Sequence, residues 1–306
     1  RDGKSRRFGQ VEEALKMNTK VKGALTIFLF LIGLCLLGQS FGPDQAGLAP
    51  NLDAFNLVPL SPGHLLGTDS LGHDLFTIAC LGARNSLAIG LISALIAVSF
   101  GTLWGAAASL AGTGISTLMM RIVDALLAIP SLILLLALTA LIKTPEFTQG
   151  LPVEVLELLG VTRSSLGLIP LLSIILVISA TSWLEAARIA HTKISALLLE
   201  EYIEAAVSLG AGRIRLLLRH LLPNARRIIL IQVILLVSDA VVMEAGLSFL
   251  GLGPGPATPS WGGMLRQAQS DFFYANWWAP LIPALLISLT ILSINLFGEG
   301  MLEERS

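Results

Sequence analysis

Residues 86–110 read S-L-A-I-G-L-I-S-A-L-I-A-V-S-F-G-T-L-W-G-A-A-A-S-L and contain no charged side chain. A bilayer core about 30 Å thick is crossed by about 20 apolar residues in a helix. In lipid, every backbone N–H and C=O group has to be paired inside the spanning structure, and nothing in the chain alternates as the strands of a membrane barrel do. The run therefore predicts a transmembrane helix.

Five further apolar runs predict five more transmembrane helices, at residues 23–40, 125–142, 164–184, 228–247 and 279–297. The composition agrees with this, because 54% of the residues are hydrophobic and only 13% are charged. We therefore expect an all-α membrane protein with six transmembrane helices. The two cysteines, Cys35 and Cys80, are expected to be unpaired thiols, because no spacing brings them together.

The positions of lysine and arginine predict the orientation, because these residues are enriched on the cytosolic side of a membrane. With a cytosolic N-terminus, four of the 20 Lys and Arg fall outside, namely Arg84, Lys143, Arg163 and Arg266, and the other 16 (20 − 4) fall inside. Both termini are therefore predicted to be cytosolic, with residues 1–22 as a basic tail. The basic residues are sorted by side of the membrane and do not gather into a groove, so no nucleic-acid site is predicted.

Three outer segments are expected. Residues 41–83 end in L-G-T-D-S-L-G-H-D-L-F, which predicts a turn leading into an amphipathic interfacial helix. Residues 143–165 carry Glu146, Glu154 and Glu157 and predict a short surface helix. The third segment, residues 248–278, ends in two tryptophans, which favour an interface level.

The most charged helix-forming stretch is residues 202–223, Y-I-E-A-A-V-S-L-G-A-G-R-I-R-L-L-L-R-H-L-L-P. An apolar stripe, Leu198, Tyr202, Ala205 and Leu209, predicts a first helix. Gly210 interrupts the pattern. A second stripe follows at Ile214, Leu217, Leu218 and Leu221, and Pro223 is expected to end the second helix.

A hairpin of this kind on the cytosolic side has two possible partners. Basic helices at a membrane surface usually bind anionic lipid. The first helix here is acidic, however, with Glu200, Glu201 and Glu204, and an anionic surface would repel it. The two apolar stripes are also flanked by different charges, with glutamates beside the first and arginines beside the second. A protein partner accounts for both features.

Two carboxylates, Asp239 and Glu244, fall inside the fifth predicted span. A charge at that depth is costly and usually faces a cavity or a partner. One reading places both residues along a translocation path or at a subunit interface, and the other has them neutralise a nearby arginine or reach a headgroup layer. An ion-gradient-driven secondary transporter would use the same two residues as proton or cation sites, although no internal repeat is visible.

Enzyme signatures are not found. His64, His73, His191 and His220 show no metal-binding spacing, and there is no G-x-S-x-G nucleophile motif. Gly3-Lys4-Ser5 lacks the preceding glycine and strand of a phosphate-binding loop. We therefore expect no catalytic residue, no metal site and no cofactor in this chain.

Seven motifs resemble those of the C-type permease subunits of dipeptide, oligopeptide and nickel ABC importers. One is E-A-A-x-x-x-G, from Glu204 to Gly210, which resembles the EAA loop together with Pro223, thirteen residues after the glycine. The others are L-G-T-D-S-L-G-H-D from Leu66, G-A-R-N-S-L-A-I-G at 82–90, M-R-I-V-D-A-L-L-A-I-P-S at 120–131, L-S-F-L-G-L-G followed by P-S-W-G-G-M-L at 259–265, and N-L-F-G-E-G at 295–300.

The resemblance implies one N-terminal helix plus a five-helix type I importer core at residues 84–306, in a bacterial or archaeal cytoplasmic membrane. It also implies four partners besides membrane lipid: a B-type permease, two ATP-binding subunits that hold ATP and Mg, and an outer solute-binding protein. The EAA loop, at about residues 191–224, would couple this chain to the ATP-binding subunits through Glu204, Ala205, Ala206, Gly210, Arg213, Arg215 and Pro223.

Two features depart from the pattern of the family. The family usually has G-R-D where this chain has G-H-D, with His73 in place of arginine. The segment 143–165 is also longer than is common. The resemblance implies a peptide or a related small solute as the substrate, and dipeptides, oligopeptides, nickel chelates and glutathione are all left open.

Overall fold

The computed structural model describes residues 22–37, 50–142, 144, 168–255, 258–271 and 276–303. These residues are mainly helical. They contain no β-strand, and two isolated bridges, Ser61 with His64 and Thr68 with Asp74, fold the segment before the first long helix. This agrees with the predicted all-α class, because every apolar run in the described chain has folded as helix.

The chain divides into two compact units. Unit 1 comprises Arg1–Ile89, Ser165–Leu171 and Val241–Ser306, and unit 2 comprises Gly90–Ser164 and Leu172–Ala240. Helices α2 (Leu75–Leu110) and α10 (Leu222–Phe249) each belong to both units along their length.

Unit 1 packs around Trp261, the first residue of α11 (Trp261–Asp271), whose side chain is fully buried. The indole N–H donates a hydrogen bond to the carbonyl of Ala79 on α2 at 3.1 Å. A Cβ at Gly82 would lie 2.9 Å from the Trp261 ring, so only glycine admits the indole here. The same core includes Leu31 and Leu34 of the N-terminal helix Lys22–Leu37.

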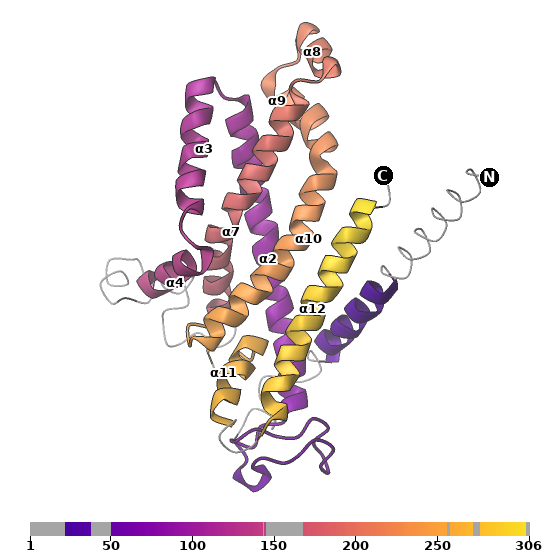
Figure 1. Cartoon of the computed structure of the whole chain (residues 1–306), viewed down its shortest axis with the longest axis vertical. Coiled ribbons are helices and arrows are strands. Elements are labelled where there is room, and N and C mark those ends of the chain that lie inside the picture. The colour runs from indigo at the N-terminus through magenta and orange to yellow at the C-terminus, as the bar shows by residue number, and fades with distance from the viewer. Residues whose placement is uncertain are drawn as a thin grey trace, which may run out of the picture. The chain divides into compact units, whose positions relative to one another are not determined.

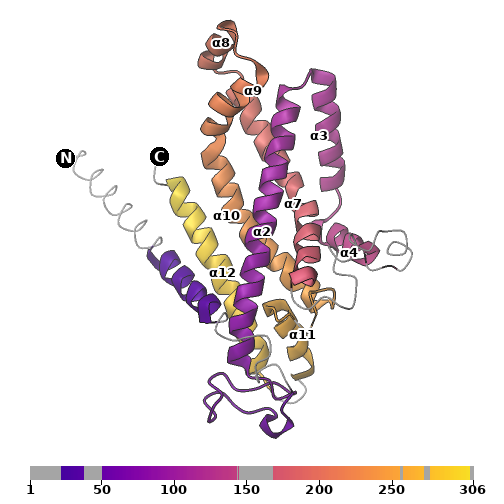
Figure 2. The ribbon, with the colours of Figure 1, turned by 180° about the vertical axis from the view of Figure 1, so that it is seen from behind.

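The N-terminal helix lies beside α12 (Trp278–Glu303), as Figures 1 and 2 show. Ser293 of α12 donates a hydrogen bond to the carbonyl of Ala24 at 2.9 Å. The 3₁₀ helix η1 (Leu52–Ala54) and the turns up to residue 74 complete unit 1. Asn276 joins these turns to the start of α12, because its side chain donates to Asn56 and to the carbonyl of Thr68.

Unit 2 packs around a close crossing of α2 and α7 (Leu168–Leu197). A Cβ at Gly101 would lie 2.5 Å from both the Ala186 methyl and the Trp183 carbonyl, so two small-residue faces bring the helices together. Helix α3 (Thr113–Leu127) lies beside the later part of α2 (Figure 2), and its Val123 is fully buried in a cluster with Leu184.

Four described helices are long and apolar enough to cross a membrane, namely Leu75–Leu110, Leu171–Leu197, Arg213–Phe249 and Trp278–Gly300. A fifth span is possible if α3 and α4 (Ser131–Ile142) count as one. The N-terminal helix is apolar, but its described part, Lys22–Leu37, is shorter than these. The total of six and the cytosolic location of both termini remain predictions.

The structure differs from the sequence-based expectation at the third span. Residues 125–142 do not form one straight helix, because α3 and α4 meet at an angle of 88°. The physical reason is Pro130, which lies directly before α4: it lacks a backbone N–H, and it disfavours helical geometry at the residue before it.

Other boundaries differ as well. Helix α7 continues to Leu197, well past the end of the predicted fourth span. The turn at residues 67–74 leads into α2 itself and not into a separate interfacial helix, since α2 is continuous from Leu75 to Leu110. The predicted surface helix within residues 143–165 lies outside the described residues.

Candidate functional site

The hairpin predicted between two spans is present. Its first helix, α8 (Glu201–Ser208), follows Glu200, whose backbone is extended at φ −77° and ψ 139°. Glu201 and Glu204 lie in the first turn, where carboxylates favour the positive end of the helix dipole. The acidic residues that favour a protein partner over lipid therefore also stabilise the start of α8.

Gly210 ends α8 in a left-handed conformation with φ +84°. The Gly210 N–H bonds the carbonyl of Val207 at 2.9 Å, and the Ala211 N–H bonds the carbonyl of Ala206 at 3.0 Å. These two bonds make a Schellman motif, which needs a left-handed residue at the glycine position. A Cβ at Gly210 would have no described atom within 4 Å, so the backbone conformation and not crowding requires glycine.

The second helix of the hairpin does not end at Pro223, which corrects the sequence-based expectation. Helix α9 (Arg213–Leu216) continues through a π-helical turn, η2 (Leu217–Leu221), directly into α10. The Leu222 N–H bonds the carbonyl of Leu217, and this wider turn precedes the proline, whose ring would otherwise crowd the carbonyl of the preceding turn.

Asn224 holds the hairpin closed, and the sequence reasoning did not single it out. Its side-chain amide donates to the carbonyl of His220 at 2.8 Å and to the hydroxyl of Tyr202 at 3.0 Å. The first bond satisfies a carbonyl within the π-helical turn, and the second ties α10 to α8. The available signal was its position directly after Pro223, within one helical turn of the His220 carbonyl.

The hairpin has its own apolar core. Ile203 of α8 is buried against Leu216 and Leu221, together with Ile194 and Leu197 of α7. Of the predicted stripe, Leu198 precedes α8 and packs half-buried against this core, whereas Tyr202, Ala205 and Leu209 lie exposed, with Leu209 at 89%. In the second helix, Ile214 is 75% exposed and Leu218 61%. The hairpin therefore presents an apolar outer face that no described residue of this chain covers.

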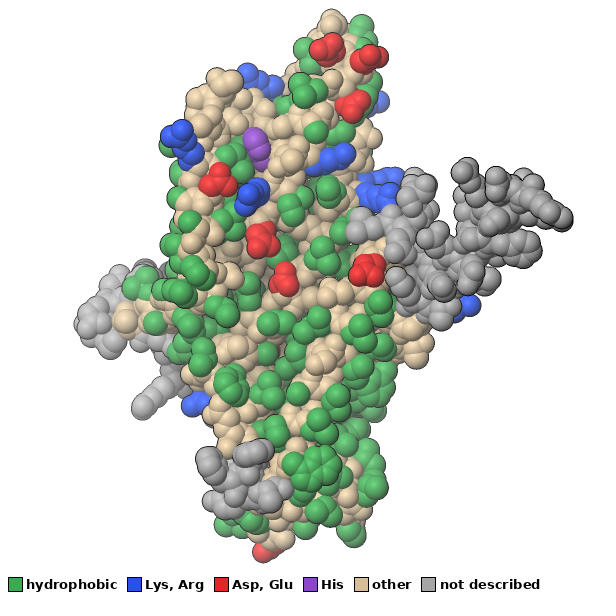
Figure 3. Space-filling model, in the orientation of Figure 1, with side chains coloured by type: hydrophobic (Ala, Val, Ile, Leu, Met, Phe, Trp, Pro, Cys, Tyr) green, Lys and Arg blue, Asp and Glu red, His purple; other side chains and the backbone are tan. Residues whose placement is uncertain are grey.

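The residues predicted for coupling occupy that outer face in part. Glu204, Ala205, Gly210, Arg213, Arg215 and Pro223 are exposed. Ala206 is half-buried and packs against the core of the hairpin, so it contributes less to the outer face than expected. Acidic side chains gather on α8 at the tip of the hairpin (Figure 3), and the exposed arginines follow it in sequence.

The two intramembrane carboxylates have different surroundings. Glu244 is fully buried inside unit 1. Its Oε2 accepts a hydrogen bond from Ser86 at 2.9 Å, and its Oε1 accepts one from Ser248 at 2.6 Å. Ser86 also accepts the Trp261 N–H at 3.2 Å. Glu244 thus joins α2, α10 and α11 within unit 1, and its role in a path or at a subunit interface stays a prediction.

Asp239 lies in unit 2 and is exposed. Its prediction as a residue of the path or of a permease interface therefore remains open to test. Among the described residues, no group of three or more His, Cys, Asp or Glu side chains is placed to hold a metal ion.

Comparison with known proteins places these elements in a family. Residues 97–303 match the binding-protein-dependent transport system inner membrane component family, which is about two thirds of the chain. The chain belongs to this family of ABC importer permeases, as a C-type subunit.

Three relatives are similar to the permease over most of its length. The dipeptide transport system permease protein DppC of Bacillus subtilis is 33% identical and aligns with 94% of this chain and 81% of its own. The di/tripeptide transport system permease protein DppC of Pseudomonas aeruginosa is 36% identical, over 92% and 86%. The glutathione transport system permease protein GsiD of Pectobacterium atrosepticum is 32% identical, over 94% and 86%.

Proposed function

We propose that this permease forms one half of the translocation path of an ATP-driven importer for peptides or peptide-like solutes. A B-type permease supplies the other half, two ATP-binding subunits supply the energy, and an outer solute-binding protein delivers the solute. The observation that carries the proposal is the uncovered outer face of the hairpin, where apolar side chains, carboxylates and arginines stand together.

Such a surface fits a protein partner. Exposed apolar residues bordered by charges mark interaction sites, and the mixture of signs disfavours an anionic lipid surface. The hairpin is also stiff, because a Schellman motif, a buried apolar core and Asn224 fix its two helices together. Since α9, η2 and α10 are continuous, a displacement of the docked hairpin would move α10 as a rigid body.

The alternative of an ion-gradient-driven transporter needs accessible carboxylates in the membrane. Glu244 does not suit that role, because it is enclosed and is already hydrogen-bonded to Ser86 and Ser248, which leaves the exposed Asp239 as the one candidate of the two. Peptides are favoured as substrates because the names of the similar permeases refer to dipeptides, di/tripeptides and oligopeptides, with glutathione, itself a peptide-like solute, as a further case.

The test is uptake of labelled peptide into vesicles that contain the permease with its co-purifying subunits and solute-binding protein. We expect uptake with ATP and none with an ion gradient alone. Uptake driven by a gradient in vesicles that contain this chain alone would reject the proposal.

Gly210→Trp tests the coupling role of the hairpin. A Cβ at Gly210 has no described atom within 4 Å, so crowding does not prevent the variant from assembling, although the left-handed backbone strains any residue with a side chain of this kind. The bulk would project from the docking face, and we expect ATP hydrolysis to continue while uptake falls at least tenfold.

Two controls separate bulk from backbone strain. Gly210→Ala imposes the left-handed strain without the bulk of tryptophan, and we expect near-normal uptake. Gly112→Trp puts the same bulk into another open glycine position, with φ −64°, and should also transport. Normal transport by Gly210→Trp would contradict the coupling assignment.

A further inference from the structure

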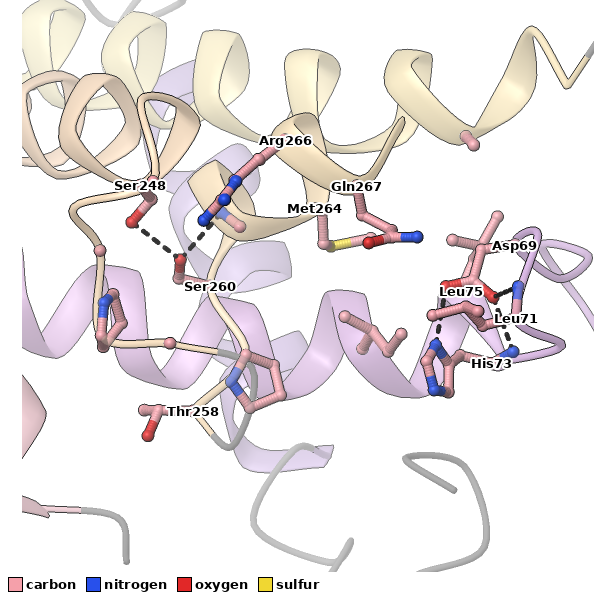
Figure 4. A pocket seen from close by; sticks show the side chains of 18 of the residues that line it. Asp69, Leu71, His73, Leu75, Ser248, Thr258, Ser260, Met264, Arg266 and Gln267 are labelled. Atoms are coloured by element: carbon pink, nitrogen blue, oxygen red, sulfur yellow. Dashed lines mark hydrogen bonds and ion pairs between the residues drawn. The ribbon is translucent and has the colours of Figure 1, made fainter. Parts of the chain in front are cut away.

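Unit 1 contains a pocket of about 610 Å³ that the proposed coupling mechanism does not use. It lies between the turns at residues 67–74, the first turns of α2, the glycine-rich loop after α10, and α11. In Figure 4, Arg266, Ser248 and Ser260 gather at one end, Asp69 and His73 at the other, and Met264 and Gln267 lie between them. The volume is in the range of sites for small molecules.

The acidic end of the pocket is already satisfied. Asp69 Oδ1 accepts the backbone N–H groups of Leu71 at 2.9 Å and His73 at 2.8 Å, and Oδ2 contacts His73 Nδ1 at 2.8 Å. The Asp69 side chain is only 3% exposed. This carboxylate therefore has little capacity left for a cationic group of a ligand.

The opposite end offers unused hydrogen-bond donors. Arg266 is exposed and makes no hydrogen bond or ion pair with any described residue. Its guanidinium lies against Gly251, where φ is +85° and a Cβ would come within 2.9 Å of the guanidinium carbon. Glycine at this position thus leaves room for the arginine to lie along the loop.

Thr258 provides an independent observation. This residue lines the pocket and is 5% exposed, yet its hydroxyl has no hydrogen-bond partner among the described residues. Leaving a buried hydroxyl unpaired is unfavourable, so a ligand with an acceptor for this hydroxyl would bind more tightly than one without it. Ser248 and Ser260 differ, because both already bond within the Glu244 cluster or α11.

The wall between the two ends is apolar. Leu75, Ile78 and Met264 line it, and Leu75 and Met264 belong to the core of unit 1. A ligand that suits this pocket therefore carries an anionic group for Arg266, an acceptor for Thr258 and an apolar side chain for the wall.

We propose that this pocket binds the C-terminal carboxylate and the last side chain of a peptide. This inference rests on the proposed function, because it places part of a transported peptide in the permease itself. Arg266 pairs with the carboxylate, Thr258 donates its hydroxyl to an acceptor on the ligand, and the apolar wall receives the side chain. The pocket would thus contribute to substrate selection beside the solute-binding protein.

The experiment measures equilibrium binding of radiolabelled alanyl-leucine to the intact permease complex in nanodiscs, without the solute-binding protein. We expect saturable binding of the free acid and at least tenfold weaker binding of alanyl-leucinamide, which lacks the carboxylate. Arg266→Gln should weaken binding of the free acid at least tenfold, and Arg266→Lys should restore part of it. Thr258→Val should weaken it by a smaller factor.

Arg121→Gln, which removes an exposed arginine from α3, is the matched control and should bind as the unaltered complex does. Equal binding of acid and amide, unchanged binding by Arg266→Gln, or no saturable binding of the acid would each overturn the proposal. ATP-driven uptake by the same complex is measured separately. Uptake without pocket binding rejects the pocket alone, whereas absence of uptake rejects the proposed function.

Discussion

Asp69 and Glu244 are the two charged side chains that are almost fully buried among the described residues, and both lie in unit 1. Each is surrounded by hydrogen-bond donors. Asp69 accepts two backbone N–H groups and contacts His73, and Glu244 accepts two serine hydroxyls. Burial of a polar group is tolerated when its hydrogen bonds are made, so these residues act as junctions between segments.

Replacing Glu244 tests this structural role. Glu244→Gln keeps the shape and can keep at least one serine bond, so we expect a loss of about 1–2 kcal/mol in the free energy of unfolding. Glu244→Ala leaves a cavity and unpaired serines, and we expect a loss of about 2–5 kcal/mol. Thermal unfolding of the purified variants gives the comparison. Equal stability of the alanine variant and the unaltered permease would contradict the junction role.

Asp239 differs from the two buried carboxylates in its exposure. It is exposed, so Asp239→Asn should leave the melting temperature and assembly unchanged while altering the rate of ATP-driven uptake. Uptake assays and co-purification of the partner subunits measure the two effects separately. Loss of co-purification would place Asp239 at a subunit interface, and unchanged uptake would exclude it from the path.

The two intramembrane carboxylates could be identified from the sequence, but the difference between their surroundings could not. Ser86 is 158 residues away from Glu244 in the chain, and no local pattern predicts contact over that distance. Thr258 likewise reads as an ordinary loop residue until its burial is known. Contacts of this kind depend on how helices pack, which periodicity does not determine.

At the scale of elements, the crossing of α2 and α7 depends on two glycines. A Cβ at Gly105 would lie 2.7 Å from the His191 backbone nitrogen and closer still to the Ala187 carbonyl oxygen. Both atoms belong to helix backbone, which has little freedom to move aside. Two hydrogen bonds also join α2 to α7 at this crossing. The Ser109 hydroxyl donates to the His191 carbonyl, and the Ser195 hydroxyl donates to the Ser109 hydroxyl.

Gly105→Ala is therefore expected to destabilise unit 2 by about 1–3 kcal/mol through overpacking, although alanine is the better helix former. Gly114→Ala in α3 is the matched control, because its Cβ would meet no atom within 4 Å, and it should be neutral or slightly stabilising. Melting temperatures of the two variants measure the difference. A stabilising Gly105→Ala would mean that the helices separate at little cost.

The sequence predicted that a helix is present more reliably than it predicted where the helix begins and ends. Uncharged runs located α2, α10 and α12, because burial in lipid selects apolar residues along a whole span. The continuation of α7 to Leu197 was missed, since that part carries Glu185, Arg188 and Lys193 and its helix depends on packing. The hairpin was predicted from Gly210, but the passage through Pro223 needed a π-helical turn that no composition rule indicates.

At the scale of the whole molecule, lysines and arginines are unevenly distributed along the chain. This distribution predicts which side of the membrane each loop occupies. The 16 lysines and arginines predicted to lie inside include five in the hairpin and the start of α10, at Arg213, Arg215, Arg219, Arg226 and Arg227. Residues 52–74 contain no lysine or arginine. The rule that basic residues remain in the cytosol thus predicts opposite sides for the hairpin and for the turns before α2.

Single cysteines test this orientation in whole cells with a membrane-impermeant maleimide. Leu52 in η1 is 76% exposed and Leu209 after α8 is 89% exposed, so Leu52→Cys and Leu209→Cys give accessible thiols with little effect on packing. We expect Leu52→Cys to react in intact cells and Leu209→Cys to react only after lysis in a detergent that dissociates the ATP-binding subunits proposed to cover the hairpin. The unaltered permease gives the background from Cys35 and Cys80, of which Cys80 is buried. Reaction of Leu209→Cys in intact cells would invert the topology, and the hairpin would then be unable to reach subunits that hydrolyse cytosolic ATP.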